Sequence, residues 1–465
     1  MLNAAQATES NQWWHRITAE SLGSASFRNS YHIKYAYVAG AMYKGIASKE
    51  MVVALGKANL LGYLGTGGMS FEEISDSIDF IRSELSEGQS FGLNFLTNQG
   101  SDLETQLVDL YLRKSVRFIE ASSFMQLTES IVRYRLSGVH IVNGRVVAPN
   151  KVMAKISRPE VAKMFMSPAP IKILNSLVAK GLLSEQEADL GKSLPVANEL
   201  VVEGDSGGHT DRGVLLAQLP AILSLRDQLA TQYGFQDSIH IGAAGGIGSP
   251  QSAVAAFFMG ADFVMTGSIN QCTVEADTSD AVKDILQGLD IQDTAHAPAG
   301  DLFELGSQVQ VVRKGGFFAT RANKLFELYA QYESIDDIPP VMLKQLEEKY
   351  FGRTIEQVWD ETKQHILRTA PTGYDAISSN PKKKMLAIFK WYFFHSNRLA
   401  RGGSQKEKVN YQIQCGPAMG VFNHWVRGTE LEPWRNRFVS VIGERLMQGA
   451  AELVKAKVDQ LARVC

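Results

Sequence analysis

The feature that most constrains the fold is a pair of elements that recurs between residues 37 and 268. In each pair, a short apolar run typical of a buried strand precedes a helical pattern of apolar residues. About eight such pairs follow one another, which is typical of a closed (β/α)8 barrel rather than an open sheet. The predicted strands are Tyr37–Ala41, Leu61–Leu64, Phe91–Phe95, Val116–Glu120, Val152–Ile156, Glu199–Glu203, Ile239–Gly245 and Asp262–Met265. An Asn143–Gly144 turn predicts one extra hairpin, over Val139–Ala148.

The chain is too long for a barrel alone, because barrels commonly use ~250 residues and this chain has 465. After Ser268 helical patterns dominate, and the final pattern, Phe438–Ala462, has the length and period of an eighth barrel helix. We therefore predict an α/β TIM barrel formed by residues 1–285 and 411–465. Residues 286–410 are predicted to form a helical insertion domain between the last strand and the last helix, over the catalytic face.

Composition excludes several classes of protein. The formal net charge of −2 argues against general binding to nucleic acid or membranes. No apolar run reaches the ~18 residues of a membrane span, and the first residues are too polar for a signal peptide. Cys272, Cys415 and Cys465 have no metal-ligand spacing and fit a reducing compartment. We expect no metal site and a cytoplasmic protein. The sequence leaves the oligomeric state open, with a homodimer as one candidate.

Glycine turns follow two consecutive predicted strands, at Gly245–Gly246 and at Gly267–Ser268. Parallel strands place both turns at one end of the barrel, where the loops after strands 7 and 8 often bind phosphate through backbone N–H groups. One hypothesis is therefore a phosphate-binding cup. Ordinary turn glycines are an equally good interpretation of this stretch alone.

Functional residues of a barrel lie where its strands end. Small residues, glycines, one amide and one cation occupy these ends, a set that suits a flat phosphorylated cofactor. The residues are Ala41, Met42, Gly67, Gly68, Asn94, Glu120, Lys155, Gly207, Gly208, His209, Gly245, Gly246, Gly267 and Ser268. The ammonium of Lys155 would stabilise negative charge on a reduced flavin at its N1 edge. The alternative for Lys155 is a solvated lysine on the barrel rim.

His209 is the histidine predicted at a strand end of the barrel, and it could move a proton to or from a substrate carbon. The alternative is a histidine at a helix start that bonds only to backbone. No nucleophile with a base at a recognisable spacing, zinc motif or Walker loop is present, which disfavours hydrolases and kinases.

The segment from residue 381 to 408 is strongly basic, with Glu407 as its single acidic residue. It could dock an acidic partner, or it could be the solvated face of an amphipathic helix. Its candidate partner-binding residues are Lys382, Lys383, Lys384, Arg398 and Arg401.

Several motifs resemble the FMN-dependent nitronate monooxygenase and enoyl reductase group: AGAM at 39–42, LGYLGTGGMS at 61–70, FGLNF at 91–95, SGGH at 206–209, GAAGGI at 242–247 and GADFVMTGS at 260–268. The segment 297–329, the KKKM and FKWYF motifs after it, and YQIQCGPAMGVFNHW at 411–425 extend the resemblance through the insertion. These blocks resemble the stand-alone enoyl reductases of polyunsaturated fatty acid synthases and trans-acyltransferase polyketide synthases.

The resemblance implies FMN, a hydride donor that is NADPH or NADH, and an enoyl thioester on an acyl carrier protein. It implies that FMN lies near Ala41, Met42, Asn94, Lys155, Gly245, Gly246, Gly267 and Ser268, with the loop 416–420, which includes Gly416, closing over the ring. We add Gly207 and Gly208 to the cofactor-binding candidates, and His209 and Lys155 are the catalytic candidates.

The function expected from these observations is an enoyl reductase acting in trans in polyketide or polyunsaturated fatty acid biosynthesis. Hydride passes from the nicotinamide through FMN to the thioester. One alternative is a nitronate-type flavin oxygenase, which would turn over in air without nicotinamide. The other is a non-catalytic assembly protein that binds carrier protein through its basic insertion.

Overall fold

The computed structural model describes residues 13–97, 102–369 and 371–463, and its central feature is a closed barrel of eight parallel strands. Around the barrel the strands follow the order β1-β11-β10-β8-β7-β4-β3-β2. The strands are β1 (Tyr37–Ala39), β2 (Leu61–Leu64), β3 (Gly92–Leu96), β4 (Phe118–Ser122), β7 (Lys151–Ile156), β8 (Glu199–Glu203), β10 (His240–Ala244) and β11 (Phe263–Thr266). The predicted TIM barrel is therefore confirmed.

Alternation along each strand separates the barrel interior from the layer beneath the helices. In β8, Leu200 and Val202 belong to the large core between strands and helices, whereas Val201 belongs to a smaller cluster that fills the barrel. The same alternation in β4 sends Ile119 and Ala121 outward. Glu120 between them therefore faces the interior.

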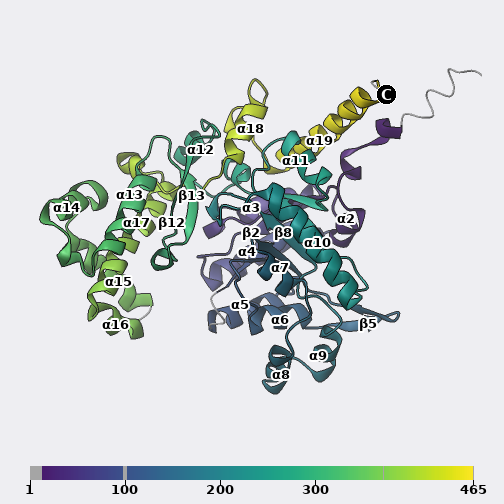
Figure 1. Cartoon of the computed structure of the whole chain (residues 1–465), viewed down its shortest axis with the longest axis horizontal. Coiled ribbons are helices and arrows are strands. Elements are labelled where there is room, and N and C mark those ends of the chain that lie inside the picture. Colours follow the sequence, from purple (N-terminus) through teal and green to yellow (C-terminus); the bar gives the residue numbers. More distant parts are fainter. Residues whose placement is uncertain (1–12, 98–101, 370, 464–465) are drawn as a thin grey trace, which may run out of the picture. The chain divides into compact units, whose positions relative to one another are not determined.

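Helices surround the strands (Figure 1). They are α3 (Lys49–Lys57), α4 (Phe71–Glu84), α5 (Asp102–Arg113), α6 (Glu129–Leu136), α7 (Pro159–Phe165), α8 (Ile171–Ala179), α9 (Glu185–Gly191), α10 (Leu215–Tyr233), α11 (Pro250–Phe258) and α19 (Val439–Ala462). The last of them packs against α11 and α3, which is the place of an eighth barrel helix, as predicted. No helix in the described part of the chain is long and apolar enough to cross a membrane.

A short helix, α2 (Ala25–Tyr31), closes the amino-terminal end of the barrel. Its Phe27 ring stacks on Phe263, the first residue of β11, at a centroid distance of 4.1 Å. Its Tyr31 hydroxyl donates a hydrogen bond of 2.7 Å to Glu199, the first residue of β8. Aromatic rings thus fill this end, and the carboxyl ends of the strands are left for a ligand.

The predicted hairpin is present as β5 (His140–Val142) and β6 (Arg145–Val147), which pair antiparallel. Asn143 and Gly144 connect them with φ angles of 50° and 77°. Positive φ at both central residues is the requirement of a type I′ turn, which Asn-Gly meets at little cost.

A second compact unit comprises Ser206–Asp211 and Thr278–Asn423, and the rest of the chain forms the barrel unit. Helices dominate the second unit, but a three-stranded antiparallel sheet, which the sequence analysis does not predict, accompanies them. Its strands are β12 (Thr294–Pro298), β13 (Gln308–Val312) and β9 (Gly208–His209). Its helices are α12 (Asp280–Leu286), α13 (Phe318–Gln331), α14 (Pro340–Gln345), the π-helical η7 (Leu346–Phe351), α15 (Ile355–Thr369), α16 (Tyr374–Ser378), α17 (Pro381–Gly402) and the start of α18 (Ala418–Val426).

The limits of this unit differ from the predicted 286–410. Residues 206–211 join it because β9 pairs with β13. Its two ends extend further because the Asn423 amide donates hydrogen bonds of 2.9 Å to the carbonyls of Leu286 and Leu289, which ties the start of α18 to the end of α12. Both contacts join segments far apart in sequence, which periodicity does not reveal.

Candidate functional site

Four inward-facing polar side chains gather at the carboxyl ends of four barrel strands. Lys155 of β7 places its Nζ 3.2 Å from Oε1 of Glu203 in β8 and 3.9 Å from Oε1 of Glu120 in β4. Asn94 of β3 pairs in register with Glu120. The predicted residues Asn94 and Lys155 therefore belong to one cluster, in which two carboxylates flank one ammonium.

Glu120 is the centre of this cluster, with a fully buried side chain. Its Oε2 accepts a 3.0 Å hydrogen bond from the backbone N–H of Ala41, just after β1. Its backbone carbonyl accepts one of 3.1 Å from Nδ2 of Asn94, which also lies 3.4 Å from Oε1. The Ser122 hydroxyl donates to the same Oε1 at 3.3 Å.

Burial and charge act against each other in this cluster. Burial raises the pKa of the Glu120 carboxyl, and the attraction of Lys155 and the Ala41 hydrogen bond only partly offset it. Burial alone would lower the pKa of Lys155, but Glu203 and Glu120 outweigh burial and leave that pKa raised. Lys155 therefore stays protonated at neutral pH, as its predicted role of stabilising negative charge on a cofactor requires.

The two glycine turns lie at the ends of neighbouring parallel strands, β10 and β11. A Cβ added at Gly246 or at Gly267 would meet no other atom within 4 Å, so both face open space. Gly245 differs, because its Cβ would lie 2.8 Å from the backbone carbon of Gly204. Ser268 follows as the first residue of the 3-10 helix η4 (Ser268–Cys272). Open space is thus present beside Gly246 and Gly267.

His209 does not end a barrel strand, which corrects its predicted position and leaves its catalytic role a prediction. It lies in β9 of the second unit, paired with Val309 of β13. Its Nε2 is 3.0 Å from Oδ1 of Asp301. Burial acts to raise the pKa of Asp301, but the hydrogen bond and charge of His209 outweigh burial and lower that pKa. This hydrogen bond orients the imidazole ring.

Three predicted glycines belong to the same part of the second unit as His209. Gly208 pairs with Gln310 and has a φ of +88°, which a residue with a side chain rarely adopts. A Cβ on Gly416 would lie 2.8 Å from the backbone nitrogen of Gly207. Position 416 therefore needs glycine for the close approach of its loop to the backbone of Gly207, whatever this part of the unit binds.

The basic segment divides into residues with different roles. Lys382 Nζ donates to the carbonyls of Tyr329 and Tyr332 in the last turn of α13 and lies 4.3 Å from the centre of the Tyr329 ring. Lys384 lies over the Trp359 ring at 5.1 Å. Lys383 and Arg398 are exposed, and Arg401 is half-buried. Lys382 thus caps a helix rather than presenting a docking charge.

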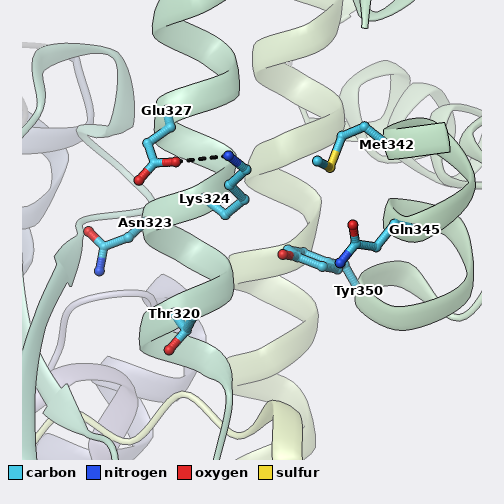
Figure 2. A pocket seen from close by; sticks show the side chains of 7 residues that line it. All are labelled: Thr320, Asn323, Lys324, Glu327, Met342, Gln345 and Tyr350. Atoms are coloured by element: carbon cyan, nitrogen blue, oxygen red, sulfur yellow. Dashed lines mark hydrogen bonds and ion pairs between the residues drawn. The ribbon is translucent and has the colours of Figure 1, made fainter. Parts of the chain in front are cut away.

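A groove of about 510 Å³ crosses the second unit between α13 and the pair α14 and η7 (Figure 2). The residues lining it are Thr320, Asn323, Lys324, Glu327, Met342, Gln345 and Tyr350. Its one lining cation, Lys324, is paired with Glu327 at 3.0 Å. None of the predicted cofactor-binding or partner-binding residues lines it.

Sequence reasoning missed two partners of the predicted residues, Glu203 and Asp301. Glu203 ends a correctly predicted strand two residues after the inward-facing Val201, so strand alternation could have identified it as inward-facing. No sequence pattern could have identified Asp301, because its contact with His209 joins segments that are far apart in the sequence. Cys272 and Cys415 are buried and form no disulfide in the described part of the chain, and Cys465 lies outside the described residues.

Two protein-family models match different parts of the chain. Residues 26–297 match the model of the nitronate monooxygenase family, which is more than half of the chain. The chain belongs to the nitronate monooxygenase family. Residues 332–411 of this family member match a second model, the inserted helical domain of [acyl-carrier-protein] S-malonyltransferase.

Three relatives place this member of the nitronate monooxygenase family more closely. The enoyl reductase domain of MlnA, from the macrolactin biosynthesis cluster of Bacillus amyloliquefaciens, is 44% identical with a TM-score of 0.92, over 95% of this chain and 99% of that domain. Polyketide biosynthesis protein PksE of Bacillus subtilis is 52% identical over 96% of this chain and 58% of its own length. A component of the polyunsaturated fatty acid synthase of a Thraustochytrium species is 39% identical over 90% of this chain and 28% of its own. The chain thus belongs to the branch that contains the MlnA enoyl reductase domain, and it spans only part of the two longer relatives.

Proposed function

We propose that this protein is an FMN-dependent enoyl reductase that reduces the α,β-double bond of a thioester carried on an acyl carrier protein. The similarity to the MlnA enoyl reductase domain over nearly the whole of both chains is the observation that carries this proposal. FMN would supply hydride transfer between NADPH or NADH and the β-carbon. The proposal retains the expected cytoplasmic location and the synthase setting of the PksE and fatty acid synthase relatives.

The barrel residues fit the phosphate of FMN. Gly246 and Gly267 face open space at the ends of strands 7 and 8 of the barrel, where barrels commonly bind phosphate. Ser268 adds a hydroxyl to the same turn. We propose that Gly245 serves differently, allowing its loop to approach Gly204 closely and so shaping the cup.

The cluster around Glu120 suits the ring of FMN. Ala41 and Met42 would border the ring, Asn94 would offer an amide to its polar edge, and the Lys155 ammonium would stabilise negative charge as it develops there. Glu203 and Glu120 keep Lys155 protonated without placing it in water. The cation is thus fixed in place before any cofactor binds.

We retain His209 as the candidate proton donor to the α-carbon. Its contact with Asp301, 3.0 Å from Nε2 to Oδ1, orients the ring, which is how carboxylates commonly prepare a histidine for proton transfer. Gly207, Gly208 and Gly416 would then shape the backbone around that histidine. The proposal does not depend on His209 lying in a barrel strand.

We propose the exposed face of α17 as the docking surface for the acyl carrier protein. Lys383, Arg398 and Phe394 share this face by helical spacing, and Phe394 is 52% exposed. The helix carries six lysines and arginines and no acidic residue, which suits an acidic partner. The similarity of residues 332–411 to the inserted domain of a transferase named for acyl carrier protein also supports this partner.

A visible spectrum of the purified protein tests the proposed reaction. Under anaerobic conditions we expect NADPH or NADH to bleach a flavin spectrum and a short enoyl thioester to restore it. A nitronate-type oxygenase, the activity that names the family, would instead consume oxygen with a nitronate in the absence of nicotinamide. A colourless protein that cannot be reconstituted with FMN would refute both.

A further inference from the structure

We propose that Glu120 is a positioning residue of the cofactor site, because one carboxylate holds together three groups that would border FMN: the backbone of Ala41, the amide of Asn94 and the ammonium of Lys155. The inference rests on the proposed flavin-dependent function. It adds a residue that does not itself need to touch the cofactor.

The position of Glu120 allows this role because it connects strands that are not neighbours. Glu120 lies in β4, and β1 is separated from β4 by β2 and β3 in the barrel order. The 3.0 Å hydrogen bond from the Ala41 N–H therefore reaches across the interior of the barrel. The contacts of Glu120 with Asn94 and Lys155 add β3 and β7 on either side of β4.

The end of β1 is shaped to receive this carboxylate. The Gly40 N–H donates to Thr266 of β11 at 2.9 Å, so the strand pairing continues to Gly40. The next donor, the Ala41 N–H, turns to Glu120 instead. A Cβ on Gly40 would lie 2.8 Å from the Met265 sulfur and 3.5 Å from Oε2 of Glu120. Glycine at position 40 thus leaves the room in which this hydrogen bond forms.

The need to neutralise Lys155 does not by itself explain why a second carboxylate, Glu120, is buried beside it. Glu203 is closer to Lys155, at 3.2 Å against 3.9 Å, and already serves as its counter-charge. A second, fully buried carboxylate is costly, and a buried ion pair seldom repays that cost in stability. What distinguishes the Glu120 carboxylate is that it accepts hydrogen bonds from the Ala41 N–H at 3.0 Å and from the Asn94 amide at 3.4 Å. Buried groups with perturbed titration at strand ends are typical of functional sites.

The decisive comparison is Glu120→Gln against Glu203→Gln. Each variant removes one carboxylate beside Lys155. Only Glu120→Gln also replaces an acceptor of both the Ala41 N–H and the Asn94 amide by a group that carries an N–H₂ donor. We expect Glu120→Gln to weaken FMN binding to the apoprotein roughly ten- to hundred-fold, as when a hydrogen bond to a charged group is lost. Glu203→Gln should change that affinity only a few-fold and should raise the flavin reduction potential, because Lys155 loses its nearest counter-charge.

FMN titration of apoprotein, the visible spectrum and the reduction potential are the measurements, with thermal unfolding of each apoprotein as the test of folding. Equal small losses of affinity in both variants would overturn the positioning role, since Glu120 would then act by charge alone. If Glu120→Gln does not fold, Ser122→Ala replaces it, because this hydroxyl donates to Glu120 and accepts from Asn94. Unchanged FMN affinity and spectrum in Ser122→Ala would then overturn the proposal. Wild-type protein that binds no FMN would instead refute the proposed function itself.

Discussion

The barrel mouth and the outer face of α17 both owe their proposed roles to lysines, yet these lysines have very different surroundings. Lys155 lies in the barrel between the half-buried Glu203 and the fully buried Glu120, and these two carboxylates keep it charged. In α17 three consecutive lysines have three surroundings: Lys382 caps α13, Lys383 is exposed, and Lys384 lies over Trp359. Successive helical residues point roughly 100° apart, so a basic run cannot act as one surface.

The role of each of these lysines thus depends on the groups that surround its ammonium. Carboxylates at fixed distances favour chemistry in the barrel, backbone carbonyls favour a structural role for Lys382, and exposure favours docking for Lys383.

The largest effect is expected from Gly267→Val in the barrel unit. Gly267 has a negative φ of −131°, a ψ of −76° and open space around it, so a new side chain would meet no protein atom and would fill the phosphate cup. We expect complete loss of bound FMN, measured as flavin absorbance per protein. Gly246→Val should lose FMN too, but its φ of +80° adds backbone strain. Gly402→Val, at another open glycine, is the matched control. Full FMN occupancy in Gly267→Val would refute the cup.

The second effect concerns His209, the catalytic candidate that lies outside the barrel unit. His209→Ala should leave reduction by nicotinamide nearly intact and slow the thioester half-reaction on the order of 10²- to 10⁴-fold, the usual contribution of a positioned acid. Asp301→Asn should slow the same half-reaction less, because it only orients the ring. Stopped-flow absorbance measures both steps.

A solvent isotope effect on the native thioester half-reaction is the companion measurement for His209. If that effect is missing and His209→Ala weakens both half-reactions equally and mildly, the proton comes from elsewhere.

The third effect separates two adjacent lysines of α17. Lys382→Met should lower the free energy of unfolding by about 1–3 kcal/mol, because two carbonyls at the end of α13 lose a charged donor. Lys383→Met should change it by less than ~0.5 kcal/mol, as at other exposed sites. Urea unfolding of both variants makes the comparison. Equal changes in the free energy of unfolding would mean that the hydrogen bonds of Lys382 to the end of α13 add no stability.

The smallest effect is a pH dependence that comes from Glu120. Its pKa is raised above the ordinary 4.5 in the folded protein, so folding favours the protonated form. The stabilising contribution is fully present below pH 4.5 and is lost as pH rises through the folded pKa. Urea unfolding of the apoprotein would be measured from below pH 4.5 upward. The free energy of unfolding of the wild type should fall with pH relative to that of Glu120→Gln. A difference between them that is constant, or that rises with pH, contradicts the role of burial.

Sequence periodicity was sufficient to predict the barrel, because each buried strand carries an apolar run and each surface helix its own period. The glycine turns and Lys155 were found for the same reason, since strand ends define where function lies. Strand β9 was missed because two residues, Gly208 and His209, cannot show alternation.

Pairings between distant segments were equally invisible in the sequence. The role of Lys382 depends on α17 beginning beside the end of α13, and the role of Glu120 depends on its reach to Ala41. Neither distance can be obtained from composition or spacing. These contacts determine which of the predicted charges serve binding, chemistry or stability.

The central claim is that Lys155 in the barrel serves the reaction and that the exposed face of α17 binds the carrier protein. Two variants assayed with two substrates test this claim. Lys155→Met and the double variant Lys383→Glu/Arg398→Glu would be assayed with a short soluble enoyl thioester and with the same acyl group on an acyl carrier protein. We predict that Lys155→Met lowers kcat/KM by the same factor for both substrates, whereas the double variant raises KM for the carrier-bound substrate alone. A double variant that impairs both substrates equally would contradict the account.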